Sequence, residues 1–275
     1  MEKDITLELH EKVLIKLFNR DSAITFFDIG ACEGLSSVRY NSIFPNSKAY
    51  VFEPVPNNYK KIINNIEKFN LKNAQVFELG LSSEKGEATF YVSSGNPKNK
   101  EKPLDNSTSF GNKSSSLYKP SKTKEVHPWL EFNEEITIKT DTFKNFCLDQ
   151  KINTIDFIHM DVQGAELMVL QGAKDMINNI NSIWLEVEKI ELYENQALKE
   201  DIEQFFSDKD FICLLNKVNH IAGDQFWVNK NYFDNLDENT KDYLVKLKNR
   251  TQLKSNLSSF VGNAKLSLKQ LFSSK

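Results

Sequence analysis

Residues 24–34 read ITFFDIGACEG, and this stretch decides the fold. A short apolar run surrounds Asp28 and ends in a turn that contains Gly30 and Gly34. This pattern is typical of a buried strand that leads into a helix, and residues 36–43 continue with a helical pattern. Glycines at such a turn let a ligand approach the backbone closely, and the start of the helix offers unpaired N–H groups. The stretch therefore predicts a strand, a tight turn and a helix, with a candidate ligand site at the turn.

Strands and helices continue to alternate after this turn. Apolar runs predict further strands at 49–55, 74–81, 86–92, 135–140, 155–162 and 182–188, and a closing pair near 211–230. Helical spacing of apolar residues predicts helices at 4–20, 57–70, 141–150 and 165–178. Alternation of this kind implies a mostly parallel sheet that is covered by helices. We expect an α/β fold with a sheet of about seven strands, helices on both faces and antiparallel pairing at the end.

The composition along the chain predicts three parts. Residues 1–24 hold the N-terminal helix, residues 25–235 hold the α/β domain, and residues 236–275 form a basic tail. Within the domain, residues 93–125 are rich in Ser, Asn, Lys and Pro, as in an interdomain linker or a long substrate loop. Because the α/β pattern resumes afterwards, we favour a polar substrate loop over about 93–134.

The composition also narrows the class of protein. The 35 basic and 38 acidic residues give a net charge of -3, which argues against a nucleic-acid binder. The 3 cysteines are odd in number and widely spaced, so we expect a reducing compartment with neither a disulfide framework nor a zinc site. The first residues lack the apolar core of a signal peptide, and no apolar run is long enough to span a bilayer. A cytoplasmic location is expected.

The glycine turn favours a cationic ligand. A dinucleotide site needs the pattern Gly-x-Gly-x-x-Gly, but its middle glycine would stand at position 32, which is Cys32. A carboxylate at Asp28 suits an ammonium group better than a phosphate. Glu53 ends the next strand, 19 residues after Gly34, where an acidic residue binds ribose hydroxyls in nucleotide-binding α/β folds. Separately, each feature is also compatible with an ordinary turn or a solvated strand end. Together they favour an adenosyl ligand.

A third acidic position follows the strand predicted at 155–162, within DFIHMDVQGAE at 156–166. Asp161 ends this strand at the edge where open α/β sheets bind ligands. His159 lies two residues earlier and is expected on the same face. Glu166 begins the next helix, where its negative charge is equally well explained by the helix dipole.

These motifs resemble the FkbM-type methyltransferases. The similarity rests on DIGACEG, FEPVPNNY and above all DFIHMDVQGAELMVLQGA, with a weaker likeness at SSSL in residues 114–117, and it runs from about Thr25 to Val228. It implies a Rossmann-like class I fold, S-adenosylmethionine (SAM) as cofactor, and O-methylation, often of sugar hydroxyls. It also implies a set of cofactor contacts, with Asp161 and Glu166 at the methyl-transfer end. The expected cofactor contacts are Asp28, Gly30, Ala31, Gly34, Glu53, Pro54, Leu81 and Asp161. The chain departs from the family pattern at Glu33 and His159.

O-methylation of an alcohol benefits from a general base. We expect Asp161 to anchor the site, with His159 and Glu186 as further catalytic candidates, since histidine has a suitable pKa and Glu186 ends the strand predicted at 182–188. A divalent cation on Asp161, Glu166 and Glu186 is a less favoured alternative. The acceptor is expected to be a small molecule or a glycan.

The C-terminal tail has its own character. Residues 241–275 carry eight basic residues and only Asp242 as an acidic one, and apolar residues recur at helical spacing from Leu257 to Phe272. A basic amphipathic helix can bind the inner face of a membrane or a protein partner, here through 251–275, or pack on its own domain. Two other functions stay open: a catalytically silent SAM-binding scaffold, and a nicotinamide-dependent oxidoreductase, which Cys32 disfavours. The sequence does not predict the oligomeric state.

Overall fold

The computed structural model describes residues 6–98 and 109–252. Its centre is a seven-stranded sheet with the order β3-β2-β1-β7-β8-β10-β9. The strands are β1 (Thr25–Ile29), β2 (Lys48–Phe52), β3 (Ala74–Phe77), β7 (Ile155–Met160), β8 (Ile180–Glu188), β9 (Phe211–Asn216) and β10 (Ala222–Asn229). Only β10 runs antiparallel to its neighbours in this sheet. The expected α/β fold and its seven-stranded sheet are confirmed, and the antiparallel pairing lies where the sequence placed it.

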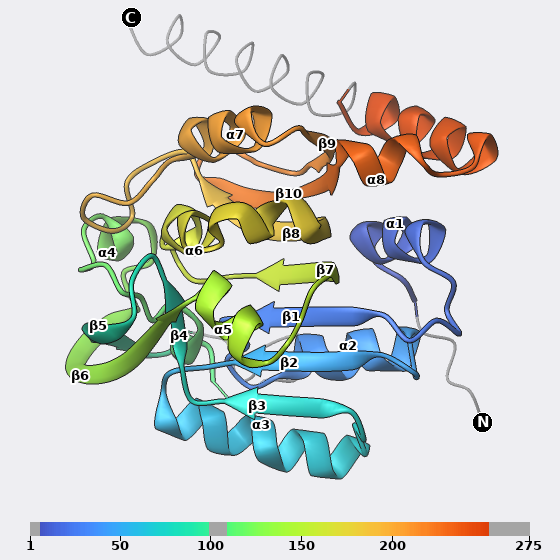
Figure 1. The fold of residues 1–275 in the computed structure, drawn as a ribbon. Helices are drawn as coiled ribbons and strands as arrows, with labels where there is room; N and C mark the ends of the chain where they lie inside the picture. The colour runs from blue at the N-terminus through green and yellow to red at the C-terminus, as the bar shows by residue number, and fades with distance from the viewer. Residues whose placement is uncertain (1–5, 99–108, 253–275) are drawn as a thin grey trace, which may run out of the picture.

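Helices cover both faces of this sheet, and Figure 1 shows α5 and α6 in front of it and α2 behind. One face packs against α5 (Phe143–Asp149), α6 (Glu166–Gly172), the 3₁₀ turn η2 (Lys174–Asn179) and α7 (Lys199–Asp208). The other face packs against α1 (Leu9–Leu17), α2 (Leu35–Ile43) and α3 (Pro56–Phe69). The predicted cover of helices on both faces is therefore confirmed.

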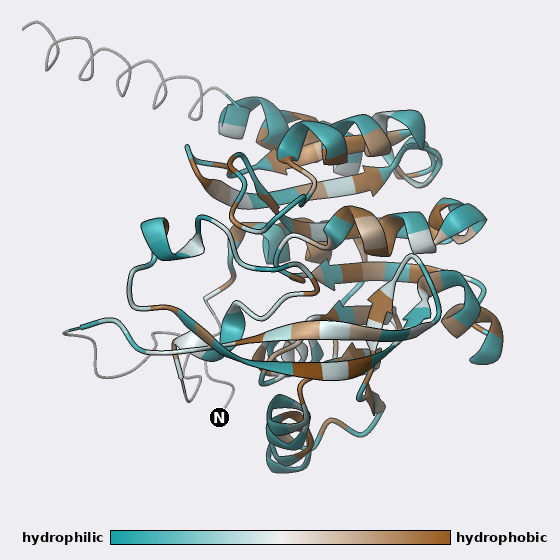
Figure 2. Ribbon diagram, turned by 90° about the vertical axis from the view of Figure 1, so that its left-hand side faces the viewer, coloured by the Kyte–Doolittle hydropathy of each residue, from teal (hydrophilic) through white to brown (hydrophobic). Residues whose placement is uncertain are grey.

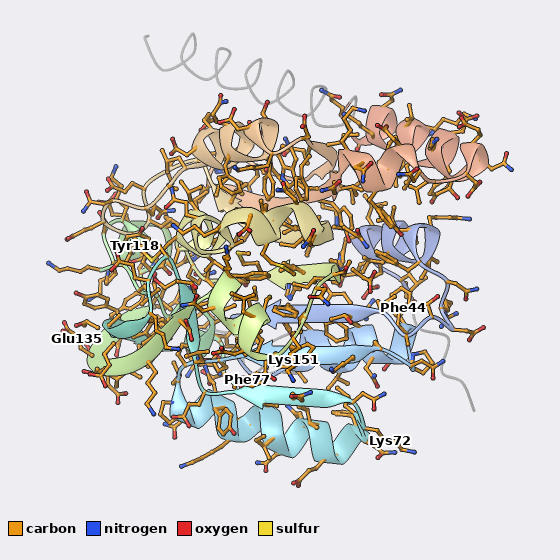
Figure 3. The ribbon with its side chains drawn as sticks, in the orientation of Figure 1. Phe44, Lys72, Phe77, Tyr118, Glu135 and Lys151 are labelled. Carbon is orange, nitrogen blue, oxygen red and sulfur yellow. The ribbon has the colours of Figure 1, made fainter. Side chains whose placement is uncertain are left out.

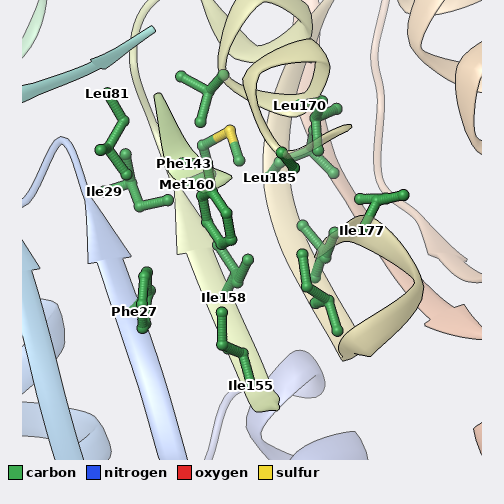
Figure 4. Packing of buried hydrophobic residues seen from close by; sticks show 14 of the residues in the cluster. Phe27, Ile29, Leu81, Phe143, Ile155, Ile158, Met160, Leu170, Ile177 and Leu185 are labelled. Atoms are coloured by element: carbon green, nitrogen blue, oxygen red, sulfur yellow. The ribbon is translucent and has the colours of Figure 1, made fainter. Parts of the chain in front are cut away.

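Successive side chains of β1 supply both apolar layers. Phe26 belongs to the cluster under α1 and α2, whereas Phe27 and Ile29 belong to the cluster under α5 and α6. Figure 4 shows Phe27 and Ile29 beside Ile158 and Met160 of the neighbouring strand. Because neighbouring residues of a strand point to opposite faces, a strand buried on both sides reads as a continuous apolar run.

Two predicted strands, 86–92 and 135–140, and the end of the strand predicted at 74–81 form a separate sheet, which corrects the expectation of a single one. β4 (Gly80–Ser82), β5 (Gly86–Ser94) and β6 (Glu131–Thr142) pair in the order β4-β6-β5. The strand predicted at 74–81 is divided into β3 and β4, which belong to different sheets. In Figure 2 the three-stranded sheet crosses in front of the carboxyl ends of the large sheet. In Figure 3 the labelled Tyr118 and Glu135 lie at this end of the molecule, and Phe44 and Lys72 lie at the opposite end.

The polar segment is shorter than the predicted loop of 93–134, because β5 extends to Ser94 and β6 begins at Glu131. Between them, outside the undescribed residues 99–108, lie the 3₁₀ turn η1 (Gly111–Lys113) and α4 (Thr123–Val126). Backbone bridges tie this segment to the domain at Tyr91–Ser116 and Pro120–Tyr193. It is therefore a structured part of the domain over its described residues.

Two predicted helices have different limits. The helix expected at 165–178 ends as α6 at Gly172, and Lys174, the first residue of η2, has a positive φ of 53°, which separates the two helical segments. The helix expected at 141–150 begins only at Phe143, because β6 runs to Thr142. In both cases the apolar residues are spaced as predicted, but local backbone geometry sets the boundary.

Both ends of the described chain pack on the same core. Val13, Leu14 and Leu17 of α1 and Leu244 join one apolar cluster with the large sheet. After α8 (Lys230–Asp234), residues 238–252 are helical. The predicted amphipathic segment lies almost entirely at 253–275, outside the described residues. Among the described residues, no helix is long and apolar enough to cross a membrane.

Candidate functional site

Two cavities meet at the carboxyl ends of β1, β2 and β7, where the strand order reverses between β1 and β7. Open α/β sheets bind ligands at such a reversal. The larger cavity holds about 540 Å³ and the smaller about 490 Å³, including space open to solvent. The two cavities share four lining residues, which are Gly30, Cys32, Lys113 and Asp161. Two compartments with a shared wall fit an elongated ligand with two different ends.

The backbone around Gly30 forms the floor between the cavities. The N–H groups of Gly30 and Ala31 donate to the carbonyl of Phe52, and the N–H of Asp161 donates to the carbonyl of Ile29. Gly30 has a φ of +81°, and a Cβ there would lie 2.0 Å from the carbonyl oxygen of Asp161. Only glycine fits this position, because any side chain would strain the backbone and collide with the Asp161 carbonyl just after β7.

Glu53, an expected cofactor contact, lines the larger cavity. It follows the last residue of β2, and its carboxylate accepts backbone hydrogen bonds from Cys32 (2.8 Å) and Val55 (2.9 Å). Burial raises the pKa of the Glu53 carboxyl to about 7, although these two hydrogen bonds oppose the rise. The carboxyl group can accept hydrogen bonds from the hydroxyl groups of a ligand.

Asp28 lines neither cavity, which differs from the expected cofactor contact. It is fully buried inside β1, where Oδ2 accepts from the Ser37 hydroxyl (2.6 Å) and Oδ1 lies 2.9 Å from Nδ1 of His159. His159 itself lines the smaller cavity. Burial lowers the pKa of His159, but the hydrogen bond and charge of Asp28 outweigh it, so that the net direction is upward.

The side-chain amide of Gln163 bridges the carboxylates of Asp161 and Glu186 by hydrogen bonds. Gln163 Nε2 donates to Asp161 Oδ1 and to Glu186 Oε2, at 2.7 Å in each case. The Tyr193 hydroxyl lies 2.9 Å from Gln163 Oε1. Burial raises the pKa of both Asp161 and Glu186. Of the two, only Asp161 lines the cavities, and Glu186 lies beside it on β8.

Glu166 does not share this arrangement. It is buried, its Oε1 accepts from the N–H of Val162 (3.0 Å), and it lines neither cavity. Among residues 6–98 and 109–252, no group of three or more His, Cys, Asp or Glu side chains is arranged to hold a metal ion. The structure therefore does not bring Asp161, Glu166 and Glu186 together as the alternative metal site requires.

The remaining predicted cofactor contacts also divide into residues that line a cavity and residues that do not. Pro54 and Leu81 line the larger cavity, and Ala31 lines the smaller one. Gly34 lines neither, and a Cβ there would lie 3.1 Å from Ile62, so its role is to allow α2 and α3 to pack closely.

Sequence reasoning missed the wall that is contributed by the polar segment. Asn112, Lys113, Ser115 and Leu117 line the larger cavity. Asn112 Nδ2 donates to Glu33 and Asn58, and its buried Oδ1 has no partner among the described residues. The SSSL likeness at 114–117 was the available signal for this wall, but nothing in the sequence indicated that it folds back onto the glycine turn.

Two relatives resemble the chain over most of its length. The chain is 29% identical over 191 residues to a protein described as "2-O-methyltransferase NoeI" from Sinorhizobium fredii, covering 70% of this chain and 73% of that protein. It is 26% identical over 216 residues to "Methyltransferase sdnD" from Sordaria araneosa, covering 72% of this chain and 77% of that protein.

Solved structures match more remotely. They include the METTL16 methyltransferase domain, at 9% identity and a TM-score of 0.43, with 80% of this chain and 65% of that chain covered. TrmK of M. capricolum with S-adenosylhomocysteine matches at 12% identity and a TM-score of 0.41, over 84% of this chain and 73% of that chain. The assignment rests instead on the sequence family described as "Methyltransferase FkbM domain", whose model matches residues 28–213. The chain belongs to the FkbM methyltransferase family.

Proposed function

We propose that this methyltransferase uses SAM to methylate a hydroxyl group, and that the acceptor is a sugar of a surface glycan or glycolipid. The observation that carries the proposal is the pair of cavities that meet at Gly30 and Asp161. An adenosyl group and an amino-acid group joined at one atom need two compartments of this kind. The similarity to NoeI, which is described as a 2-O-methyltransferase, supports transfer to oxygen.

The larger cavity has the chemistry that an adenosyl group needs. Glu53 offers carboxylate oxygens to ribose hydroxyls, and Leu81 and Val162 offer apolar walls to a flat base. The buried Oδ1 of Asn112 lacks a hydrogen-bond donor, and a hydroxyl or amino group of the ligand would satisfy it. SAM, when bound, supplies an electrophilic methyl group.

The residues beside the cavities can move the acceptor's proton. Gln163 holds the carboxylates of Asp161 and Glu186 by one amide, so the two act as a unit. Because burial raises the pKa of both carboxyl groups, each is a stronger proton acceptor in its charged form than a solvated carboxylate. We infer that this pair accepts the proton that the acceptor hydroxyl loses. The same residues orient the hydroxyl, and the wall at 112–117 excludes water from the larger cavity.

The proposal is tested in two steps with purified protein. Calorimetry should show binding of SAM and none of NAD. Incubation with methyl-labelled SAM and a cellular glycan and glycolipid fraction should then transfer label that resists alkaline hydrolysis, as a methyl ether does and a methyl ester does not. Glu186→Gln is the variant that should bind SAM but transfer little label, because it removes half of the acid pair without changing either cavity wall.

Each alternative function has its own outcome. Binding of NAD in place of SAM would support the oxidoreductase. Binding of SAM without transfer of label to any fraction would support the silent scaffold. Label that alkali removes would contradict methylation of a hydroxyl. The cytoplasmic location and the membrane or protein partner of the tail stay predictions, and so does the absence of a nucleic-acid partner.

A further inference from the structure

Asp28 and His159 form a buried pair at the base of the smaller cavity. They are directly paired residues of the neighbouring strands β1 and β7. Asp28 Oδ1 lies 2.9 Å from His159 Nδ1, and its Oδ2 accepts from the Ser37 hydroxyl at 2.6 Å. Asp28 and Ser37 are both fully buried. Both oxygens of Asp28 are therefore occupied by the protein itself, and none is left for a ligand.

This pairing fixes the tautomer of the neutral imidazole. A carboxylate can only accept hydrogen bonds, so Nδ1 of His159 carries the hydrogen, and in the neutral ring Nε2 keeps a lone pair. The Tyr40 ring packs edge-on against the imidazole, with centroids 5.6 Å apart, and holds its orientation. No hydrogen bond reaches Nε2 from the described residues, and the side chain keeps 19% of its surface exposed on the cavity.

Another part of the lining of the smaller cavity has different chemistry. Leu35 and Ser36 begin α2 and line the cavity, and no side chain caps this nine-residue helix. The free N–H groups of a helix N-terminus favour a carboxylate. Asp161 lines the wall beside His159 and favours a cation. One wall thus suits a carboxylate and the other an ammonium group, as in a zwitterionic amino acid.

We propose that Nε2 of His159 accepts a hydrogen bond from the ammonium group at the amino-acid end of SAM, and that Asp28 and Ser37 are positioning residues that act only through His159. The inference rests on the proposed function, because it concerns the same cofactor. In this arrangement His159 makes the direct contact with the ligand that was expected of Asp28. The free carboxylate of the ligand then lies at the start of α2.

Two cofactor fragments test this assignment without any knowledge of the acceptor. S-adenosylhomocysteine has the amino-acid end, and 5′-methylthioadenosine lacks it but keeps the adenosyl group. In calorimetry, His159→Ala should weaken S-adenosylhomocysteine binding by about tenfold or more, as expected for the loss of a hydrogen bond to a charged group. The affinity of His159→Ala for 5′-methylthioadenosine should stay within about twofold of the wild-type value, which would also show that the variant is folded. His220→Ala, at an exposed histidine, is the matched control and should change neither affinity.

Asp28→Asn tests the positioning role separately. An asparagine amide can donate to Nδ1 and so favour the other tautomer, in which Nε2 carries the hydrogen. Nitrogen-15 spectra of labelled histidine should show this exchange, together with weaker binding of S-adenosylhomocysteine and little change for 5′-methylthioadenosine. Equal losses for both ligands, or none for either, in His159→Ala would overturn the inference and leave the proposed function intact. If the wild-type protein bound neither ligand, the proposed function would fail and the inference with it.

Discussion

Two acidic residues at the ends of neighbouring strands have opposite surroundings. Asp28 pairs with Val51 inside the sheet, whereas Glu53 stands two residues beyond Val51, after β2 has ended. Asp28 is consequently enclosed by Ser37 and His159, whereas Glu53 reaches the larger cavity and accepts hydrogen bonds from two backbone N–H groups and from the Asn58 side chain. An acidic residue near a strand end contacts a ligand only if the register carries it past the edge of the sheet.

The largest effect is expected at Gly30, which lines both cavities. Gly30→Ala should lower the free energy of unfolding by more than about 4 kcal/mol, because it adds backbone strain to a collision with the Asp161 carbonyl. Thermal or chemical unfolding measures the change. Gly86→Ala is the matched control, since a Cβ at Gly86 would meet nothing within 4 Å, and its effect should be small. Similar stabilities for the two variants would contradict the backbone geometry on which the comparison depends.

The second effect concerns pH and Glu53. The pKa of Glu53 is about 7 in the folded protein, since burial disfavours its charge, against about 4.3 in an unfolded chain. Below the unfolded value both states hold the proton. Between the two values only the folded state holds it, so the free energy of unfolding falls as pH rises through this window. The loss is at most about 4 kcal/mol and is complete above the folded value.

Glu53→Gln removes this titration and leaves every other acid in place. Without ligand, the stability of the variant relative to wild type should therefore be higher at pH 8 than at pH 5 in chemical unfolding. Any constant cost of the amide cancels in this comparison between the two pH values. A difference that does not depend on pH would show that Glu53 is not held in the buried state described.

A smaller loss is expected for Asp28→Asn. The substitution removes the charge that both hydrogen bonds of Asp28 use and forces one partner to change its role, so stability should fall by about 2 kcal/mol. Unfolding by denaturant measures the change, and Asp149→Asn, at an exposed carboxylate, should change stability by less than about 0.5 kcal/mol. A stability equal to that of wild type would mean that Asp28 is less tightly enclosed than the structure shows.

The smallest effect is expected for Ser37→Ala. It removes one hydroxyl that donates to Asp28 and should cost about 1 kcal/mol. Ser42→Ala is the control on the same helix, because Ser42 is exposed and its hydroxyl bonds only to the carbonyl of Val38. If both substitutions had the same small effect, the Ser37 hydrogen bond would contribute nothing specific to the buried pair.

The sequence predicted the fold better than the site. Apolar runs such as that of β1 identify strands buried on both faces, and the glycine turn located the ligand edge. They could not show that 74–81 divides between two sheets, because that break depends on the pairing of β4 with β6, far along the chain. In the same way, Glu53 was recognisable from its spacing, whereas the contacts of Asp28 depend on His159, 131 residues away. Asn112 and Gln163 were missed because their roles exist only through tertiary contacts.

The most direct test of the central claim is the affinity for SAM of wild-type protein and of Glu53→Gln, measured by calorimetry at one pH. If Glu53 holds the adenosyl end in the larger cavity, wild type binds SAM and the variant binds it at least about tenfold more weakly, with the same loss for 5′-methylthioadenosine. Equal affinities in the two proteins, or no binding of SAM by wild type, would contradict the account.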